Sequence, residues 1–272
     1  MIENKKTVLV IGASGGIGSV TVELLLKRGW KVFATDIQIQ KNTESEEKSI
    51  EWMEMDISNA HSVESVFEII SQKVNGLDAV VHLAGTLSIG SLIEVPIERM
   101  QHALEINLLG IYRVNQRFLP LILNRKGRII HLSSEVGIQA AAPFNGIYAI
   151  TKHALEAYSD ALRRELMFLG VKVIKIQPGP IKTEMTKSGE ALFEKAANES
   201  KHFKRQLNKG LAYLPAVYRG AHEPAVVAEV IGRAIEHESP KSAYRVVIDK
   251  TRMLLDLLPT RWSDKLIAYF LS

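Results

Sequence analysis

The sequence predicts one α/β domain in which a doubly wound parallel sheet has helices on both faces. Short apolar runs rich in valine and isoleucine alternate with longer segments of helical periodicity. Apolar strands separated by helices of this length indicate βαβ units, and their right-handed crossovers give a doubly wound sheet. No linker rich in proline, glycine or serine divides the 272 residues, so a single domain over residues 1–272 is expected.

The individual elements follow from this alternation. The expected strands are residues 7–11, 31–35, 79–83, 128–132, 172–176 and 244–248. The expected helices are residues 17–28, 60–73, 99–119, 149–168 and 224–236. The stretch 183–223 interrupts this order and is the least regular part of the sequence, as expected of a functional or mobile insertion. The apolar segment 249–272 is broken by charges and proline, which predicts a packed or interfacial tail.

Composition excludes several kinds of site. The chain has no cysteine, so disulfides, thiol catalysis and cysteine-based zinc sites are excluded, and no metal site is expected. The apolar run 7–11 is too short for a signal-peptide core. No stretch approaches the roughly 18 apolar residues of a membrane span. These features predict a cytoplasmic protein.

The net charge of +4 is concentrated in one segment. Residues 195–222 contain six lysine and arginine residues against one glutamate. A solvated surface is the simplest interpretation, and attraction of an anionic substrate or a membrane surface is the alternative. Nucleic-acid binding is not expected, because neither interleaved aromatic residues nor a recognised module is present.

A glycine-rich turn follows the first expected strand and leads into the first expected helix. It reads Ile11-Gly-Ala-Ser-Gly-Gly-Ile-Gly18, and glycines at such a turn allow close approach of a pyrophosphate to the helix N-terminus. The next strand ends at Asp36, 18 residues after Gly18. A carboxylate there accepts hydrogen bonds from ribose hydroxyls and repels a 2′-phosphate. Neither Ile37 nor Gln38 offers a cation that could bind a 2′-phosphate, so the sequence favours NAD over NADP in a Rossmann-type domain. The alternative is a turn that contains glycine and aspartate only because its geometry requires them.

Tyr148 and Lys152 open a strongly helical segment. Their i, i+4 spacing places both side chains on one helix face. A free tyrosine titrates near pH 10, and a nearby ammonium is expected to lower that pKa toward the range of a general base. This pair alone is common by chance, and an exposed pair on a helix is the alternative.

Together with the motifs around it, the chain resembles the short-chain dehydrogenase/reductase family from Thr7 to about Ile248. Glycines 12, 16 and 18 match the family's glycine-rich fingerprint, although Ile11 stands where threonine is usual. Asp56 matches the acidic residue that contacts adenine. His82-Leu-Ala-Gly85 matches the family's Asn-Asn-Ala-Gly motif only in its last two positions, which puts the usual asparagine hydrogen bonds in doubt.

The same resemblance implies the catalytic set. Asn107 matches the structural and proton-relay asparagine, and Ser134 matches the catalytic serine, with Ser133 the less favoured candidate. With Tyr148 and Lys152 they form the expected catalytic residues. The residues implied to bind the cofactor are Gly12, Ser14, Gly16, Ile17, Gly18, Asp36, Asp56, Ile57, Leu83, Ala84, Gly85, Tyr148, Lys152, Pro178, Gly179, Ile181 and Thr183.

The expected reaction is hydride transfer between an alcohol carbon and the nicotinamide of NAD. Tyr148 exchanges the hydroxyl proton, Lys152 lowers the tyrosine pKa and binds the ribose, Ser134 orients the substrate oxygen, and Asn107 holds a water that links Lys152 to solvent. The segment around Tyr148 is most similar to the hydroxysteroid and retinol dehydrogenase branches. This resemblance implies a lipophilic alcohol or ketone as substrate, a lid over residues 184–223, and a homodimer or homotetramer formed through helices 99–119 and 149–168.

Two other functions stay open at this point. One is a non-catalytic NAD(H) sensor on the same fold, and the other is a sugar-nucleotide epimerase or dehydratase of the extended branch. The tail 249–272 also has two interpretations, because its apolar residues could cover the substrate pocket or lie at a membrane surface.

Overall fold

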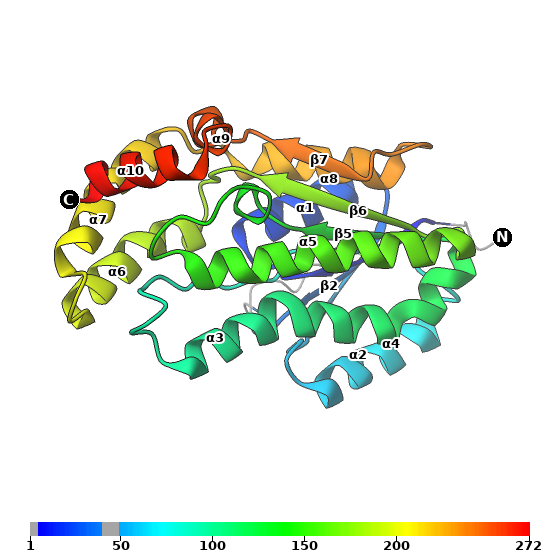
Figure 1. Ribbon diagram of the computed structural model, residues 1–272. Helices are drawn as coiled ribbons and strands as arrows, with labels where there is room; N and C mark the ends of the chain where they lie inside the picture. Colours follow the sequence, from blue (N-terminus) through cyan, green and yellow to red (C-terminus); the bar gives the residue numbers. More distant parts are fainter. Residues whose placement is uncertain (1–4, 40–48) are drawn as a thin grey trace.

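Seven parallel strands form the centre of the structure, in the order β3-β2-β1-β4-β5-β6-β7 (Figure 1). The computed structural model describes residues 5–39 and 49–272. Within them the strands are β1 (Thr7–Ile11), β2 (Lys31–Asp36), β3 (Ile50–Glu54), β4 (Ala79–His82), β5 (Arg128–Leu132), β6 (Lys172–Pro178) and β7 (Ala243–Val246). The direction of winding reverses between β1 and β4, and ligands bind at such a point beyond the carboxyl ends of the strands.

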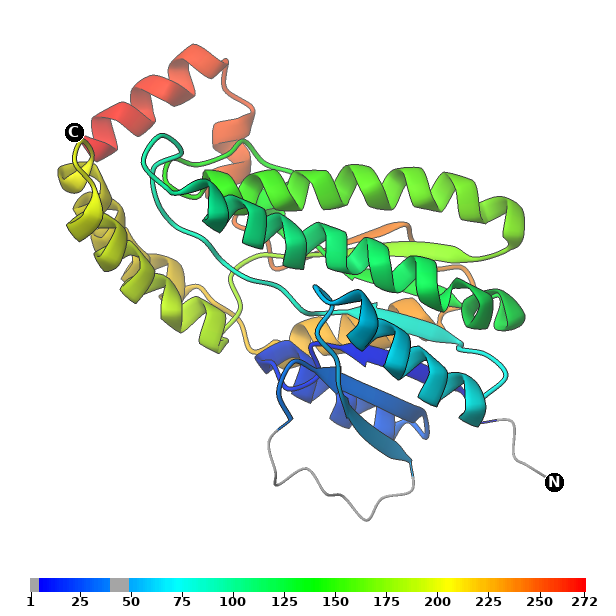
Figure 2. The ribbon, with the colours of Figure 1, turned by 90° about the horizontal axis from the view of Figure 1, so that it is seen from below.

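Helices cover both faces of the sheet, as the sequence predicts. α1 (Gly16–Lys27) and α8 (Pro224–Glu236) pack together on one face. The other face carries α2 (Ala60–Lys73), α4 (Gly110–Arg125) and α5 (Gly146–Leu166), as Figures 1 and 2 show.

Successive residues of a central strand belong to the two different cores. In β1, Val8 and Val10 lie in the core beneath α1 and α8, whereas Leu9 and Ile11 lie in the core on the opposite face. All four side chains are almost completely buried, because successive residues of a strand point to opposite faces and both faces are covered.

Three predictions from the sequence are wrong in detail. The edge strand β3 was missed, because Ile50-Glu-Trp-Met-Glu54 alternates charged and apolar residues and lacks the apolar run of a central strand. The single expected helix 99–119 is divided into α3 (Ile97–Leu104), a π-helical turn (Glu105–Leu109) and α4. The stretch 183–223, expected to be irregular, forms α6 (Glu184–Glu199) and α7 (Lys204–Arg219).

The expected tail forms two further helices, α9 (Lys250–Asp256) and α10 (Thr260–Leu271). Figures 1 and 2 show α10 beside α7 at one end of the molecule, with the C-terminus at the end of α7. Among the residues that the structure describes, no helix has the length and apolarity needed to cross a bilayer.

A chain of polar side chains lies buried between the central strands and the helices α4 and α5. His82 of β4 and His131 of β5 are neighbours in the sheet, and Asn115 of α4 lies between them. The distance from His82 Nε2 to Asn115 Oδ1 is 2.8 Å, and that from Asn115 Nδ2 to His131 Nε2 is 2.9 Å. His131 Nδ1 lies 2.8 Å from Ser159 Oγ, which donates to the Leu155 carbonyl.

One assignment of protons satisfies this chain and makes both histidines neutral, because the buried Nδ1 of His82 has no partner within the described residues and a proton there would be unsatisfied. The Asn115 carbonyl oxygen accepts, so His82 Nε2 carries the hydrogen; the Asn115 amide donates, so His131 is protonated at Nδ1. A second proton on His131 would set two donors against each other. Burial lowers the pKa of His82 to about 4 and that of His131 well below its usual value.

The stability of the fold is therefore expected to decrease as the pH falls from about 6.5 toward 4. In this window the unfolded histidines take up protons that the buried, neutral ones do not, so protonation favours the unfolded state; the shift of His82 alone corresponds to about 3 kcal/mol. Urea denaturation across this pH range measures the effect. His82→Gln keeps an amide hydrogen donor but cannot titrate, and it should flatten the dependence. Substitution of the exposed His61 by glutamine is the control, and equal slopes for both variants would contradict the assignment.

Candidate active site

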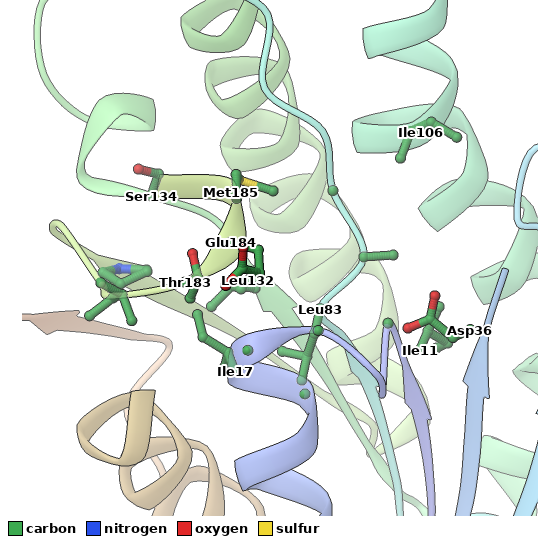
Figure 3. A pocket seen from close by; sticks show the side chains of 18 of the residues that line it. Ile11, Ile17, Asp36, Leu83, Ile106, Leu132, Ser134, Thr183, Glu184 and Met185 are labelled. Atoms are coloured by element: carbon green, nitrogen blue, oxygen red, sulfur yellow. The ribbon is translucent and has the colours of Figure 1, made fainter. Parts of the chain in front are cut away.

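A pocket of about 490 Å³ lies beyond the carboxyl ends of the strands, at the point where the winding reverses (Figure 3). Its lining comes from the turn after β1, from the ends of β2 to β6 and the segments that follow them, from α3 and the π-helical turn, and from α5 and the start of α6. Figure 3 shows Asp36 at one end of the pocket and Ser134 at the other. The two halves of the predicted site therefore belong to one cavity.

The glycine turn brings the N-terminus of α1 against the neighbouring strands. Gly12 has φ of +80°, and a Cβ there would lie 2.5 Å from the backbone nitrogen of Ala84, which follows β4. A Cβ on Gly16 would lie 3.0 Å from the side chain of Thr183, beyond β6. No side chain caps α1 and its first turn has no acidic residue, so its backbone N–H groups are suited to an anionic group such as a pyrophosphate.

Asp36 is held in place by the same turn. Its Oδ2 accepts a hydrogen bond of 2.8 Å from the Ser14 N–H, and its Oδ1 accepts one of 2.8 Å from the Ile37 N–H. Each carboxylate oxygen retains a free lone pair, so the carboxylate can accept hydrogen bonds from the two hydroxyls of a ribose. A phosphate in that place would meet the negative charge.

Tyr148 and Lys152 lie near the start of α5 and both line the pocket. The Lys152 Nζ is 5.6 Å from the centre of the Tyr148 ring and donates a hydrogen bond of 2.8 Å to the Leu132 carbonyl at the end of β5. The ammonium is thus fixed between the tyrosine and the strand end. The expected i, i+4 pair is not an exposed helix pair, because Lys152 is only 4% exposed.

Ser134 opens the turn that follows β5 and reaches Tyr148. Its hydroxyl accepts a hydrogen bond from the Val136 N–H and is also hydrogen-bonded to the Tyr148 side chain. Ser133, the less favoured candidate, lines the pocket too, but its buried hydroxyl has no hydrogen-bond partner within the described residues. The arrangement therefore favours Ser134 beside the tyrosine.

Asn107 lies in the π-helical turn and connects two parts of the site without lining the pocket. Its amide oxygen accepts a hydrogen bond from the Thr86 N–H, and its amide nitrogen donates to the Thr86 carbonyl and to the Thr151 hydroxyl. The Asn107 side chain therefore connects the segment after β4 to α5, where its partner Thr151 immediately precedes Lys152. Its expected link to a water stays a prediction.

The ionisation of the pair differs from the expectation. Burial raises the pKa of Tyr148 to about 12, against a lowering by the hydrogen bond from Ser134. Burial also lowers the pKa of Lys152 to about 8, opposed by the negative charge of Glu156. The predicted lowering of the tyrosine pKa is thus absent, because the loss of hydration outweighs the hydrogen bond from Ser134 and the negative charge of Glu135 adds to the rise. Tyr148 is accordingly a protonated phenol at neutral pH.

The structure brings together nearly all of the residues that the sequence implied for cofactor binding. Sixteen of them line the pocket, and the exception is Ser14, whose backbone holds Asp36 instead. His102 and Ile106 also line it and were missed. They are four residues apart on α3 and the π-helical turn, and nothing in a sequence expected to form one continuous helix indicated which face meets the pocket.

The lid expected over residues 184–223 contributes less to the pocket than its composition indicates. Among its apolar residues, Met185 lines the pocket, whereas four others pack into a separate apolar cluster with Ile89: Leu192, Phe193, Phe203 and Leu207. The Glu94 carboxylate fixes the connection between α6 and α7 by accepting hydrogen bonds from Ser200 and from the backbone N–H groups of Lys201 and His202. These four apolar residues of the lid therefore belong to a separate core and do not line the pocket.

Two glycines of the turn should respond differently to alanine. A Cβ on Gly18 would lie 2.0 Å from the Gly12 carbonyl oxygen, whereas one on Gly15 would lie 3.4 Å from the same atom. Gly18→Ala must displace the turn and is expected to cost about 1–3 kcal/mol of stability, as overpacking does. Gly15→Ala is the matched control and should leave the thermal unfolding of the protein without ligand nearly unchanged. Equal melting temperatures for the two variants would refute the packing described for this turn.

Comparison with known proteins agrees with this geometry. Residues 6–191 match the family model for short chain dehydrogenase. A probable short-chain type dehydrogenase/reductase, VdlC of Helicobacter pylori, is 33% identical, with 95% of each chain covered. An NADPH-dependent 3-dehydrocapnine reductase of Ornithobacterium rhinotracheale is 33% identical, with 95% of this chain and 94% of the relative covered. The 17-beta-hydroxysteroid dehydrogenase type 6 of Homo sapiens is 28% identical, with 97% and 88% covered.

Solved structures show the same fold. A short-chain dehydrogenase of Streptomyces avermitilis superposes with a TM-score of 0.77 at 21% identity, covering 98% of this chain and 95% of the other. A short chain dehydrogenase of Burkholderia cenocepacia in complex with NADP gives a TM-score of 0.74 at 20% identity, covering 98% of both chains. The family model covers residues 6–191, and a relative of 33% identity covers 95% of the chain, so the chain belongs to the short-chain dehydrogenase/reductase family of oxidoreductases.

Proposed function

We propose that the chain interconverts an alcohol and its carbonyl compound by hydride transfer with NAD as the preferred cofactor. The observation that carries this proposal is that Asp36 and the Ser134, Tyr148 and Lys152 side chains all line one pocket, with Asp36 and Ser134 at opposite ends of it (Figure 3). A nicotinamide dinucleotide is the cofactor class of the family, and the glycine turn and Asp36 suit its pyrophosphate and ribose. When bound, it supplies the hydride acceptor or donor.

The chain's own residues handle the proton. The Tyr148 hydroxyl donates a proton to a carbonyl oxygen in reduction or accepts one from an alcohol in oxidation, and Ser134 orients the same oxygen. The raised pKa of Tyr148 favours the protonated form, which is the form that reduction requires. Lys152, held by the Leu132 carbonyl, places a positive charge where a phenolate would form.

The apolar lining near Ser134 supports a lipophilic substrate of the steroid or retinoid class. Met185 and Leu132 line the pocket near Ser134, and the one lysine among the described lining residues is Lys152. The basic residues 195–222 do not line the pocket, so they provide no binding partner for an anionic group on the substrate. The hydroxysteroid dehydrogenase among the relatives supports this substrate class.

We also infer a homodimer or homotetramer formed through α4 and α5. Tyr112 of α4, Ile150 of α5 and the adjoining Leu109 are exposed apolar side chains on these two helices. The cytoplasmic location expected from the sequence stays a prediction.

Replacement of Tyr148 by phenylalanine should lower kcat/KM by at least about a hundredfold while cofactor binding stays within about twofold, because the proton donor is lost and the ring is kept. A panel of steroids, retinols and short alcohols, followed by NADH absorbance, measures turnover, and cofactor fluorescence measures binding. Tyr158→Phe is the matched control, because this tyrosine lies on the same helix but does not line the pocket, and its hydroxyl accepts a hydrogen bond from the Asn115 amide. Unchanged turnover in Tyr148→Phe would refute the catalytic assignment, and absence of turnover with the whole panel would favour a non-catalytic sensor.

Asp36 should set the cofactor preference. Asp36→Ala removes two hydrogen-bond acceptors for the ribose and a charge that repels phosphate, so the ratio of kcat/KM for NAD to that for NADP should fall by at least about tenfold. Glu54→Ala is the control. Glu54 pairs with Asp36 at the end of β3 but does not line the pocket, so this substitution removes the same charge without changing the site. A natural protein that prefers NADP, or a ratio that Asp36→Ala leaves unchanged, would contradict the proposed preference.

A further inference from the structure

The two C-terminal helices carry an apolar surface that the described chain leaves exposed. We use the name tail surface for the exposed apolar residues Leu254, Leu257, Trp262, Leu266, Tyr269 and Phe270. α10 has no buried residue, and Trp262 is 67% and Tyr269 78% exposed. Exposure of this many large side chains on one short segment is unusual for a protein surface that faces water alone.

The apolar residues of α10 form one stripe along the helix. Trp262, Leu266 and Tyr269 follow the spacing i, i+4, i+7, which places them on the same face. The side of α10 toward the body consists of the half-buried Ser263, Ile267 and Leu271, and α10 packs against α7 and α9. The stripe therefore lies on a face of α10 that the described chain leaves exposed, and Figure 2 shows α10 itself at the edge of the molecule, apart from the sheet.

Basic side chains outnumber acidic ones near this stripe. Arg261 and Lys265 lie on α10 itself, where Asp264 is the one acidic residue. The adjacent α7 contains four basic residues and no acidic one: Lys204, Arg205, Lys209 and Arg219. Arg205 and Lys209 both donate to the Ser272 carbonyl, which fixes the end of α10 against this basic helix.

We propose that the tail surface docks the protein onto bilayers that contain anionic lipid, with α10 lying in the plane of the interface. An amphipathic helix with Trp, Tyr, Phe and Leu on one face and lysine or arginine beside them has the composition that binds such an interface. Trp and Tyr suit it because each has an apolar ring and one polar atom that stays hydrated. The basic residues match the negative charge of the lipid headgroups.

Charge favours an anionic bilayer over a second copy of the chain as the partner of the tail surface. All charged residues of α7 are basic. Two copies that met through the tail surface would bring two such helices together, and their like charges would repel. An anionic bilayer has the opposite sign and satisfies the apolar stripe and the basic residues at once. A lipid surface is therefore favoured over self-association.

The position of the tail surface also connects it to the pocket. α7 follows α6, whose first residues Glu184 and Met185 line the pocket. The Glu135 carboxylate, next to Ser134, accepts a hydrogen bond of 2.7 Å from the Asp249 N–H immediately before α9. A docked molecule would thus have residues 184–223, and with them the catalytic side of the pocket, close to the bilayer. A lipophilic substrate dissolves in the bilayer. Delivery of such a substrate rests on the proposed function, whereas docking itself does not.

Vesicle flotation of the full chain tests the docking. The protein should float with vesicles of phosphatidylcholine and phosphatidylserine and bind much less to phosphatidylcholine alone, and added salt should weaken binding. Trp262 supplies a second readout, because Trp30 is buried and Trp52 half-buried, so contact of Trp262 with lipid should shift the emission to shorter wavelength. The Tyr148→Phe variant should float as the natural protein does, which separates docking from the proposed reaction.

Two pairs of substitutions test the residues that carry the proposal. Trp262→Ser with Tyr269→Ser, and Arg261→Glu with Lys265→Glu, should each weaken binding to anionic vesicles by at least about tenfold. All four positions are exposed, and thermal unfolding confirms that the variants fold. Phe168→Ser and Lys27→Glu are the controls, because Phe168 is 81% exposed at the far end of α5 and Lys27 lies on α1; both should bind as the natural protein does.

Three results would overturn the proposal. The first is that the protein does not float with anionic vesicles. The second is that the control substitutions reduce flotation as much as the tail substitutions do. The third is that the natural protein self-associates and does not bind vesicles, whereas the Trp262→Ser, Tyr269→Ser variant is a monomer. This result would assign the tail surface to a second copy.

Discussion

The parallel register of the central strands is the constraint on which the site depends. β1, β4, β5 and β6 all end at the same edge of the sheet, so the segments that follow them meet there although they are far apart in the sequence. Gly12 then allows the turn after β1 to approach Ala84 more closely than any side chain would permit. If β5 ran in the opposite direction, the glycine turn and Ser134 would lie at opposite ends of the sheet.

Burial decides the ionisation of the groups gathered at this edge. Lys152 is held by a neutral carbonyl, that of Leu132, and its nearest acidic influence is Glu156, which itself accepts hydrogen bonds from Gln177 and pairs with Lys175. The ammonium thus gains little to offset its loss of hydration, and its pKa falls to about 8. The same cost raises the pKa of Tyr148 and keeps the nearby His82 and His131 neutral. The site is a dry region in which each added charge requires a specific partner.

The lid and the tail show how apolar residues of similar appearance serve different purposes. Phe193, Phe203 and Leu207 pack with one another and with Ile89, and Glu94 fixes the turn between their helices. Trp262 and Tyr269 stay exposed, although the Tyr269 ring contacts that of Phe270 on the same helix. The first set stabilises the enclosure around the pocket, and the second set is available to a partner.

The sequence by itself determined the fold class, the glycine turn, Asp36 and the set formed by Ser134, Tyr148 and Lys152. These are local patterns, each readable within one strand end and the helix that follows it, and the parallel sheet needs only such units in succession. The edge strand β3 escaped prediction because an edge position tolerates charged residues. Contacts between distant segments were decided by the tertiary structure alone: His102 and Ile106 in the pocket, the packed interior of the lid, and the raised pKa of Tyr148. Each depends on which neighbours remove water from a side chain, and no local pattern of residues specifies those neighbours.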